Sequence, residues 1–316
     1  MQHVKEFSLM YTLSSFWHST LYLNPKINFQ PLLEHKNLEL SLHQQQLIED
    51  TKELQSDIPF LCFTDPLYPK ILHTIPHMPP VLFYEGNLSL LDKRKVAIVG
   101  SRYCSQRAKQ ITHELSFTLG SGGHATISGL AFGIDEIAHR ANLHGSIGIL
   151  PFGFQSTLSS RHTKLCKDIL DAGGLLLSEF PLQQPAQKWT FLQRNRIISG
   201  LAEVVVITEA QIQSGSLNTA RHALDQKKEV FTIPWDPLHK EGSGCRMLLK
   251  KGVIPLLDLQ EWSEEWGILS YLDERRSIEE LIAQCNSPRE IIVQALMTLL
   301  KSKQIVRNND GTFVKS

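Results

Sequence analysis

The sequence predicts an α/β protein with a doubly wound, parallel β-sheet. Short apolar runs recur along the chain, and runs such as Val96–Val99 and Val204–Ile207 lack polar residues on either face, as buried parallel strands do. Segments of helical length separate the runs, and glycine-bearing turns join the two kinds of element. Strands that alternate with helices in this way build a parallel sheet covered by helices.

The elements follow one another regularly. We expect strands at 81–84, 96–99, 125–128, 147–150, 175–177, 204–207, 230–233 and 253–256, and helices at 105–119, 134–143, 163–171, from 214–216 onward, and at 246–251. Ligands of such sheets bind at the carboxyl ends of the strands. The loops Gly100-Ser101-Arg102, Ser128-Gly129 and Ser214-Gly215-Ser216 follow three of these strands, so we expect them to form one site.

Four regions are expected along the chain. Residues 1–57 show weak helical patterns without recognisable chemistry, residues 58–256 form the α/β domain, and residues 257–267 are an acidic linker. In residues 268–316, two helices and a hairpin around Asp310-Gly311 predict a small winged-helix module. Its second helix offers few bases for reading DNA, so we expect it to contact protein or to bind DNA weakly.

Composition restricts the class of protein. The five cysteines are odd in number, widely spaced and never in a Cys-x-x-Cys pair, which is typical of a reducing cytoplasm and gives no support to a zinc site. Apolar runs fall short of the roughly 18–20 residues that a membrane helix needs, and the first residues lack a signal-peptide pattern. We expect a cytoplasmic protein without membrane contact, metal or cofactor.

Charge is unevenly distributed although the formal net charge is zero. Residues 91–256 carry 20 basic and 13 acidic side chains, whereas residues 1–90 carry 5 and 9 and residues 257–316 carry 7 and 10. The middle region alone is therefore basic. This asymmetry indicates an acidic partner for that region, and a random fluctuation of surface charge is the alternative.

The segment 188–221 predicts a phosphate site. Ser214-Gly215-Ser216 supplies hydroxyls, a glycine and free amides at a helix start, which together suit an anion. Lys188 and Arg194-Asn195-Arg196 precede it, and Phe191 lies among these bases, where stacking contributes about 1–3 kcal/mol per base in single-strand binders. No catalytic base is evident, so the phosphate is held and not cleaved. The alternative is a core Phe191 with solvated charges.

Two other motifs have competing interpretations. Gly100-Ser101-Arg102 is no dinucleotide fingerprint because Gly-x-Gly-x-x-Gly is absent, so it is a phosphate contact or a tight turn with an exposed arginine. Asp135 and His139 share a helix face and could form an acid–base or metal pair. Structural capping and packing is the favoured interpretation of this pair.

The order of these motifs along the chain resembles that of the DNA processing protein A family (DprA, also called Smf). The resemblance rests on Val-Ala-Ile-Val-Gly-Ser-Arg at 96–102, Ser-Gly-Leu-Ala-Phe-Gly-Ile-Asp at 128–135 with Ala138-His139, Leu-Ser-Glu at 177–179, Phe191 with Arg194-Asn195-Arg196, and Ser-Gly-Ser-Leu at 214–217 with Thr219-Ala220-Arg221. Tyr68-Pro69 and residues 80–87 also fit. Coverage runs from about residue 58 to 256.

The resemblance implies an extended Rossmann-like domain that binds single-stranded DNA. It also implies a homodimer, without enzymatic activity, that protects DNA and loads the recombinase RecA during natural transformation. The DNA-binding residues would be Gly100, Ser101, Arg102, Gly129, Lys188, Phe191, Arg194, Asn195, Arg196, Ser214, Gly215, Ser216 and Arg221. Dimer contacts would lie between Cys245 and Leu256, with Met247, Leu248 and Ile254 as candidates.

The chain departs from the family pattern at several positions. Cys104 replaces a proline, Arg107 a glycine and Arg246 an asparagine, while Trp235 and the stretch from Ser159 to His162 replace other family residues. The two arginines add positive charge near the expected pocket. The changes at Trp235 and at residues 159–162 concern loop geometry and not the fold.

Two other functions remain open at this point. A nucleotide-processing enzyme resembling a phosphoribohydrolase could use the same scaffold, with Glu179 or Glu209 as the carboxylate near a strand end. Neither glutamate has the partner motif that such an enzyme needs. A protein adaptor that acts through the C-terminal module is the third hypothesis.

Overall fold

The computed structural model describes residues 58–63, 65–157, 159–259, 272, 274–285, 289–301 and 304–316. The expected helical region 1–57 lies outside the described residues, as does the acidic linker beyond residue 259. Among the described residues, no helix is both long enough and apolar enough to cross a membrane.

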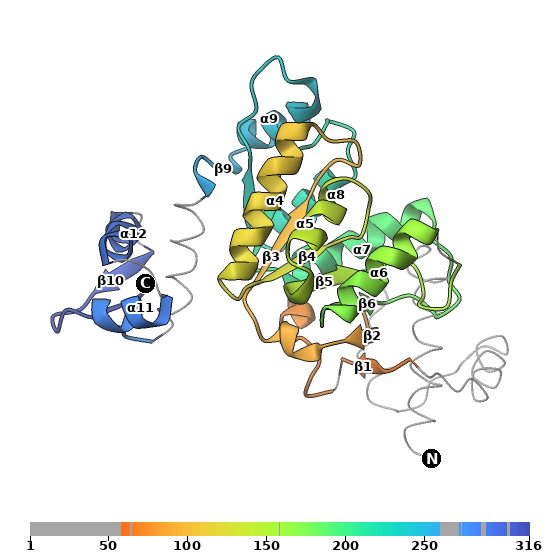
Figure 1. The fold of residues 1–316 in the computed structure, drawn as a ribbon, viewed down its shortest axis with the longest axis horizontal. Coiled ribbons are helices and arrows are strands. Elements are labelled where there is room, and N and C mark those ends of the chain that lie inside the picture. The colour runs from red at the N-terminus through yellow and green to blue at the C-terminus, as the bar shows by residue number, and fades with distance from the viewer. Residues whose placement is uncertain are drawn as a thin grey trace.

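A nine-stranded sheet forms the centre of the main domain (Figure 1). Its order is β1-β2-β6-β5-β4-β3-β7-β8-β9. The strands from β6 to β9 in this order are parallel, whereas β2 pairs antiparallel with both β6 and β1. The bounds are Phe60–Cys62 (β1), Val81–Gly86 (β2), Lys95–Val99 (β3), Ala125–Ser128 (β4), Ser146–Ile149 (β5), Leu175–Ser178 (β6), Val204–Ile207 (β7), Glu229–Thr232 (β8) and Ile254–Pro255 (β9).

This mostly parallel sheet fits the expected Rossmann-like fold, and every expected strand is present within about two residues. The short edge strand β1 was not anticipated from the sequence. Both faces of β3 are buried, with Val96 and Ile98 packed on one side and Ala97 and Val99 on the other. The four-residue apolar runs reflect this double burial.

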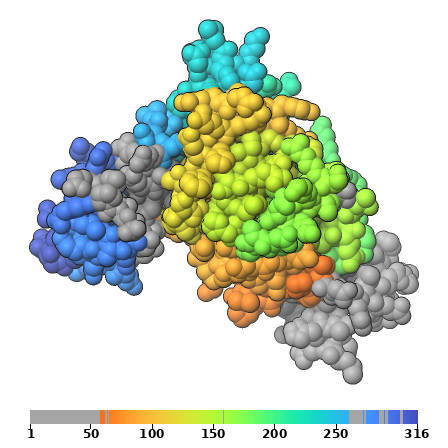
Figure 2. All heavy atoms as spheres, in the orientation of Figure 1, coloured from red at the N-terminus to blue at the C-terminus, as the bar shows by residue number. Residues whose placement is uncertain are grey.

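Helices cover both faces of the sheet (Figure 1). They are α4 (Gln106–Ser121), α5 (Ile134–Ala141), α6 (Ser160–Asp171), α7 (Lys188–Leu201), α8 (Ser216–Asp225) and α9 (Ser243–Lys250). Helices α4, α5 and α6 lie on the near face, where Figure 2 shows them packed side by side, and α7 and α8 lie on the far face. The near-face helices follow β3, β4 and β5, and the far-face helices follow β6 and β7.

Helix α7 is a helix that the sequence pattern did not reveal. It begins with a capping box between Gln187 and Thr190, and its second half is buried against the sheet. That half contains Arg194, Asn195 and Arg196, which the sequence placed beside the pocket as free polar groups. Their burial changes the role of both arginines.

The strand order reverses between β3 and β7. From β3 the chain proceeds through β4 and β5 to β6 in one direction, and β7, β8 and β9 extend the sheet in the other. The loops that leave β3 and β7 therefore diverge to opposite faces. A crevice opens at such a switch point, outside the carboxyl ends of the strands.

The C-terminal region has its own small core. It contains α11 (Ile278–Cys285), α12 (Arg289–Lys301) and an antiparallel hairpin of β10 (Ile305–Arg307) and β11 (Phe313–Lys315). Leu281, Ile292, Leu296 and Phe313 are buried together. The expected pair of helices and hairpin is thus found, and its identity as a winged helix stays a prediction.

Candidate functional site

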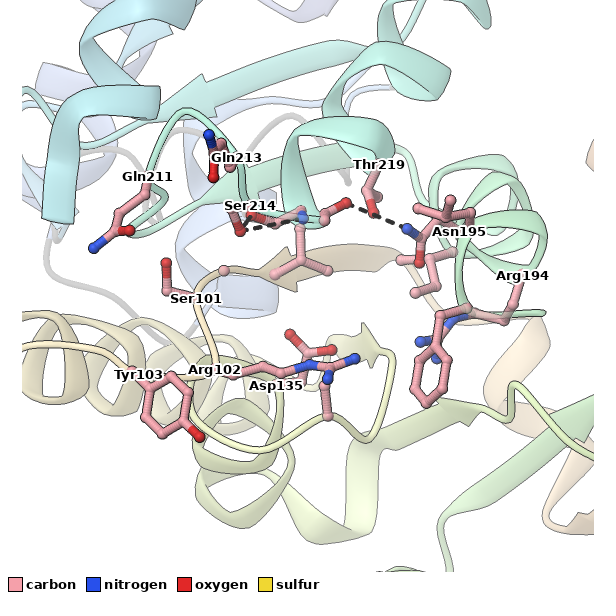
Figure 3. A pocket seen from close by; sticks show the side chains of 18 of the residues that line it. Ser101, Arg102, Tyr103, Asp135, Arg194, Asn195, Gln211, Gln213, Ser214 and Thr219 are labelled. Carbon is pink, nitrogen blue, oxygen red and sulfur yellow. Dashed lines mark hydrogen bonds between the residues drawn. The ribbon is translucent and has the colours of Figure 1, made fainter. Parts of the chain in front are cut away.

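A cavity of about 660 Å³ lies at the switch point between β3 and β7. Four segments line it: the loop after β3, the loop after β4 with the first turn of α5, the first turns of α7 and the loop that leads into α8. In Figure 3, Arg102 and Tyr103 lie on one wall, and Gln211, Gln213 and Ser214 face them from the other. The cavity is thus where a ligand of a doubly wound sheet is expected.

Most of the residues expected from the sequence meet in this cavity. Those that line it are Gly100, Ser101, Arg102, Lys188, Phe191, Arg194, Asn195, Ser214, Gly215 and Ser216. The cavity lining does not include Gly129, Arg196 and Arg221. Segments far apart in the sequence therefore form one site. The loop after β4 contributes to it through Ala131 and not through Gly129, and the start of α7 adds a segment beyond the three expected loops.

Arg102 and Lys188 are the exposed cations of the cavity wall. The guanidinium carbon of Arg102 lies 5.0 Å from the centroid of the half-buried Phe191 ring. Arg102 comes from the loop after β3 and Phe191 from α7, so the contact spans the mouth of the crevice. An aromatic ring beside exposed positive charges suits a nucleic-acid strand, which presents both bases and phosphates.

Backbone contacts fix the loop that carries Arg102. The Ser101 amide donates to the Glu209 carbonyl at 2.8 Å, and the Ile134 amide donates to the Ser101 carbonyl at 3.2 Å. Gly133 has a φ of +82°, and a Cβ there would lie 2.4 Å from the carbonyl oxygens of Ser101 and Arg102. Glycine at this position lets α5 begin directly against the loop.

Arg194 forms the floor of the cavity and does not extend into it as a free cation. Its Nη1 donates to the Gly129 carbonyl at 2.6 Å and to the Ile149 carbonyl. Burial lowers the pKa of Arg194 to about 10, while the nearby Asp135 carboxylate opposes this shift. A Cβ on Gly129 would lie 2.5 Å from Arg194 Nη1, so Gly129 provides space for the guanidinium. The expected phosphate role of Arg194 is replaced by a structural one.

Arg196 points away from the cavity into a buried ion pair. Its Nη1 and Nη2 donate to the two carboxylate oxygens of Glu179, each at 2.6 Å, and its Nε donates to the His77 carbonyl. Both partners are almost fully buried. The sequence hypothesis that Arg196 contacts DNA is therefore not supported by its position, because a buried bidentate pair is satisfied internally.

The serine loop presents hydroxyl groups more than amides. The Ser214 and Ser216 hydroxyls lie 2.7 Å apart, and the Leu217 and Asn218 amides already donate to carbonyls of the same turn. The expected free amides at the start of α8 are thus partly engaged. Arg221 lies on the exposed side of α8, where its Nε is 3.8 Å from Asp225 Oδ2. It is not part of the cavity lining in which the sequence placed it.

Several lining residues were not anticipated from the sequence. They are Tyr103, Leu192, Gln211, Gln213 and Thr219, together with Asp135, which was assigned to capping. Tyr103 directly follows the Gly-Ser-Arg motif. An aromatic residue next to a predicted phosphate contact was therefore the signal in the sequence that could have placed Tyr103 in the cavity lining. Gln211 and Gln213 precede the serine loop and carry no such pattern.

Asp135 and His139 are both buried and make hydrogen bonds within the fold. The Asp135 carboxylate accepts from the Gly129 amide at 3.1 Å, and burial raises its pKa to about 6. His139 is fully buried, its Nδ1 shares a hydrogen bond with the Ser146 hydroxyl, and burial lowers its pKa to about 3. In the part of the chain that the structure describes, no group of three or more metal-ligating side chains is present.

The two carboxylates considered for an enzyme are engaged elsewhere. Glu179 pairs with Arg196, and Glu209 accepts from the Ser105 hydroxyl at 2.7 Å, from the Ser105 amide at 2.8 Å and from His239 Nε2 at 2.7 Å. Neither belongs to the cavity lining. They fix the start of α4 and the position of α7 instead of facing a bound ligand.

Several residues that depart from the family pattern make hydrogen bonds to loop backbone or to a helix start. Trp235 Nε1 donates to the Thr208 carbonyl at 2.8 Å, and Arg246 Nη1 donates to the carbonyls of Asp236 and His239. Ser159 caps α6 by accepting from the His162 amide. Arg246 thus braces the 236–239 loop, and the cavity lining includes neither it nor Arg107.

Comparison with known proteins agrees with the sequence resemblance. The family described as DNA recombination-mediator protein A matches residues 59–267. Protein Smf of Escherichia coli (strain K12) is 41% identical over 198 residues, which are 61% of this chain and 53% of that protein. DNA processing protein DprA of Streptococcus pneumoniae is 37% identical over 206 residues, which are 64% of this chain and 72% of that protein.

Two solved structures share the fold. DNA processing protein A from Helicobacter pylori, described in its single-stranded DNA binding mode, superposes with a TM-score of 0.60 and 31% identity, covering 66% of this chain and 96% of that one. DprA from Streptococcus pneumoniae superposes with a TM-score of 0.65 and 27% sequence identity, and the match covers 82% of this chain and 94% of that one. The matched segment spans only about half of the Escherichia coli protein. The chain belongs to the DNA recombination-mediator protein A (DprA/Smf) family, whose members act in DNA processing and recombination.

Proposed function

We propose that this protein binds single-stranded DNA in the switch-point cavity, largely without sequence preference. The observation that carries the proposal is the Arg102–Phe191 contact across the mouth of the cavity, with the exposed Lys188 one helical turn away from Phe191. Cations there attract phosphates, and the ring provides a stacking surface for any base. The single-stranded DNA named for the Helicobacter pylori relative supports this choice of ligand.

The structure of the cavity favours non-specific binding. Its exposed charges are on long, flexible side chains, and its hydroxyl and amide groups (Ser214, Ser216, Asn195) offer adaptable hydrogen bonds. Base stacking does not depend strongly on base identity because every base has a π-face. Binding should therefore be governed by phosphate contacts and should weaken steeply as salt is added.

A titration with labelled oligonucleotides tests the proposal. We expect oligothymidylate and mixed-sequence single strands to bind with similar affinity, and a duplex of the same length to bind more weakly. Fluorescence anisotropy in increasing NaCl gives both the affinity and the salt slope. A preference for duplex DNA, or affinity independent of salt, would remove the basis of the proposal.

A homodimer is proposed through the far edge of the sheet. Ile254 in β9 and Leu257 just after it are exposed, at 41% and 79%, beside α9. Leu248, one of the expected contacts, is instead packed in the core of the domain, and Met247 is half-buried. Sedimentation velocity of Ile254→Asp should show monomers where the unaltered protein sediments as a dimer.

We also propose that the protein protects single strands and helps to load RecA onto them during natural transformation. The family membership, described by the words recombination mediator, supports this role. The test is the lag in the DNA-dependent ATPase activity of RecA at limiting RecA concentration. The lag should shorten when this protein is present, and an unchanged lag would contradict the loading role while leaving DNA binding intact.

A further inference from the structure

A second depression, of about 1160 Å³, adjoins the switch-point cavity. It lies over the starts of α4 and α5 and is bordered by the start of α6. Arg102, Tyr103 and Gln211 line both hollows, so the two adjoin at these residues. A strand that leaves the first hollow past Arg102 therefore enters the second directly.

Tyr103 occupies the boundary between the two hollows. The residue is 93% exposed, the highest value among the exposed large apolar and aromatic residues that the structure describes. Packing in the fold does not account for this ring, because almost none of its surface is buried. An exposed aromatic ring that lies between two polar hollows is suited to stack on a base.

The second depression has an excess of positive charge. Arg102, Lys109, Arg140 and Arg161 line it, against the carboxylates of Glu136 and Glu241. Glu136 is already paired with Arg140 at 3.0 Å and with Arg161 at 2.5 Å. Burial raises the pKa of Glu136, but the two arginines together outweigh burial and lower it. The depression therefore favours an anionic ligand.

Arg161 is held in place while remaining accessible. Its guanidinium carbon lies 4.6 Å from the centroid of the Phe132 ring, and the His162 ring stacks on Phe132 at 4.6 Å. Its side chain is nevertheless 60% exposed. A guanidinium oriented by an aromatic ring and a carboxylate, with its remaining surface in solvent, is preorganised to contact a phosphate.

We propose that the bound single strand continues from the switch-point cavity into this second depression, with one base stacked on Tyr103 and a phosphate beyond it contacted by Arg161. The inference rests on the proposed single-strand binding and extends it to a second subsite. The occupant is the same DNA strand, because the two hollows share a border and the charge of the second is complementary to phosphate. Oligonucleotides long enough to reach past Tyr103 should gain affinity from it, and shorter ones should not.

The experiment combines strand length with paired variants of the full chain. Anisotropy titrations use oligothymidylates of about 4, 8, 12 and 16 nucleotides, the range of site sizes common in single-strand binders. Tyr103→Ala is compared with Tyr103→Phe, which keeps the ring. Arg161→Gln is compared with Lys164→Gln, which removes an equal charge from the same helix at a residue outside the lining of the depression.

On long oligonucleotides, Tyr103→Ala should bind about 5- to 150-fold more weakly, the effect of one lost base stack, and Tyr103→Phe should bind as the unaltered protein does. Arg161→Gln should reduce the salt slope by about 0.7, the effect of one lost phosphate contact on a single strand, and Lys164→Gln should not. On the shortest strand that binds, Arg161→Gln and Lys164→Gln should match the unaltered protein, whereas Tyr103→Ala, which also alters the wall of the first cavity, should lose less affinity than on long strands. Glu136 keeps its Arg140 partner in Arg161→Gln, so the fold should be maintained.

The outcomes separate this inference from the proposed function. If the unaltered protein binds no single strand, the proposed function fails. If it binds, but Tyr103→Ala and Arg161→Gln leave long-strand affinity and salt slope unchanged, the second subsite is absent and only the cavity holds DNA. If Lys164→Gln has the same effect as Arg161→Gln, the depression contributes only general charge, and the subsite is likewise rejected.

Discussion

The Phe191 ring lies close to two guanidinium groups of different character. The carbon of the exposed Arg102 guanidinium is 5.0 Å from the ring centroid, and that of the buried Arg194 is 5.9 Å away. A cation–π contact at an exposed site contributes about 0.5–1 kcal/mol, whereas stacking a base contributes about 1–3 kcal/mol. A base can therefore take the place of Arg102 on the ring and leave Arg102 free to contact phosphate.

Replacing Phe191 should separate stacking from charge. Phe191→Ala is expected to weaken binding of single strands by about 1–3 kcal/mol, because one stacking surface is lost, without changing the salt slope. Phe191→Tyr keeps the ring and should retain most of the affinity. Anisotropy titrations at several salt concentrations measure both quantities, and a reduced slope in Phe191→Ala would contradict a pure stacking role.

Arg196→Ala should affect stability and not the DNA contact itself. The substitution leaves the buried Glu179 carboxylate without its bidentate partner, and breaking a buried pair in this way costs about 3–5 kcal/mol. Urea denaturation should show this loss of unfolding free energy. The double variant Arg196→Met with Glu179→Gln removes both charges and should recover part of the loss, whereas a direct DNA role for Arg196 predicts normal stability with weak binding.

Two glycines with positive φ offer a comparison. Gly133 and Gly123 have φ values of +82° and +78°, but a Cβ at Gly133 would meet two carbonyl oxygens at 2.4 Å, while at Gly123 nothing lies within 4 Å. Gly123→Ala should cost about 1–2 kcal/mol of stability from backbone strain alone. Gly133→Ala should cost more and should also weaken DNA binding, because it displaces the loop of Arg102; equal effects in both variants would reject this coupling.

His139 should make the fold sensitive to acid. Burial lowers its pKa from 6.5 to about 3, so between these values the unfolded chain binds a proton that the folded chain does not. The stability contribution is fully present above about pH 6.5 and is lost as the pH falls toward 3, by up to roughly 5 kcal/mol. His139→Gln should flatten the decline of unfolding free energy with falling pH, whereas His144→Gln, at an exposed position on the next turn, should reproduce the original profile.

Much of the fold could be predicted from the sequence because its signals are local. Runs such as Val204–Ile207 are apolar on both faces since both are covered, and this composition identifies a parallel strand without knowledge of its neighbours. The loops after β3 and β7 meet because parallel strands share one carboxyl edge. The positions of Arg102 and of the serine loop followed from this rule.

The roles of the arginines in α7 could not be predicted in the same way. Arg194 and Arg196 are two residues apart and therefore project in different directions from a helix, and their partners, Gly129 and Glu179, are distant in sequence. Because the sequence pattern did not reveal α7, both arginines were interpreted as free groups that could bind phosphate. Burial by distant segments is a tertiary property, and it left Arg102 and Lys188 as the exposed cations of the cavity.

The salt dependence of single-strand binding by Arg102→Ala tests the central claim most directly. Anisotropy titrations of the unaltered protein, Arg102→Ala and Arg107→Ala, the last an exposed arginine of α4 that is not part of the cavity lining, give the affinity and the salt slope for each. Arg102→Ala should bind more weakly with a slope reduced by about 0.7 per lost phosphate contact, and Arg107→Ala should match the unaltered protein. Equal affinity and slope in all three proteins would contradict the assignment of the switch-point cavity as the DNA site.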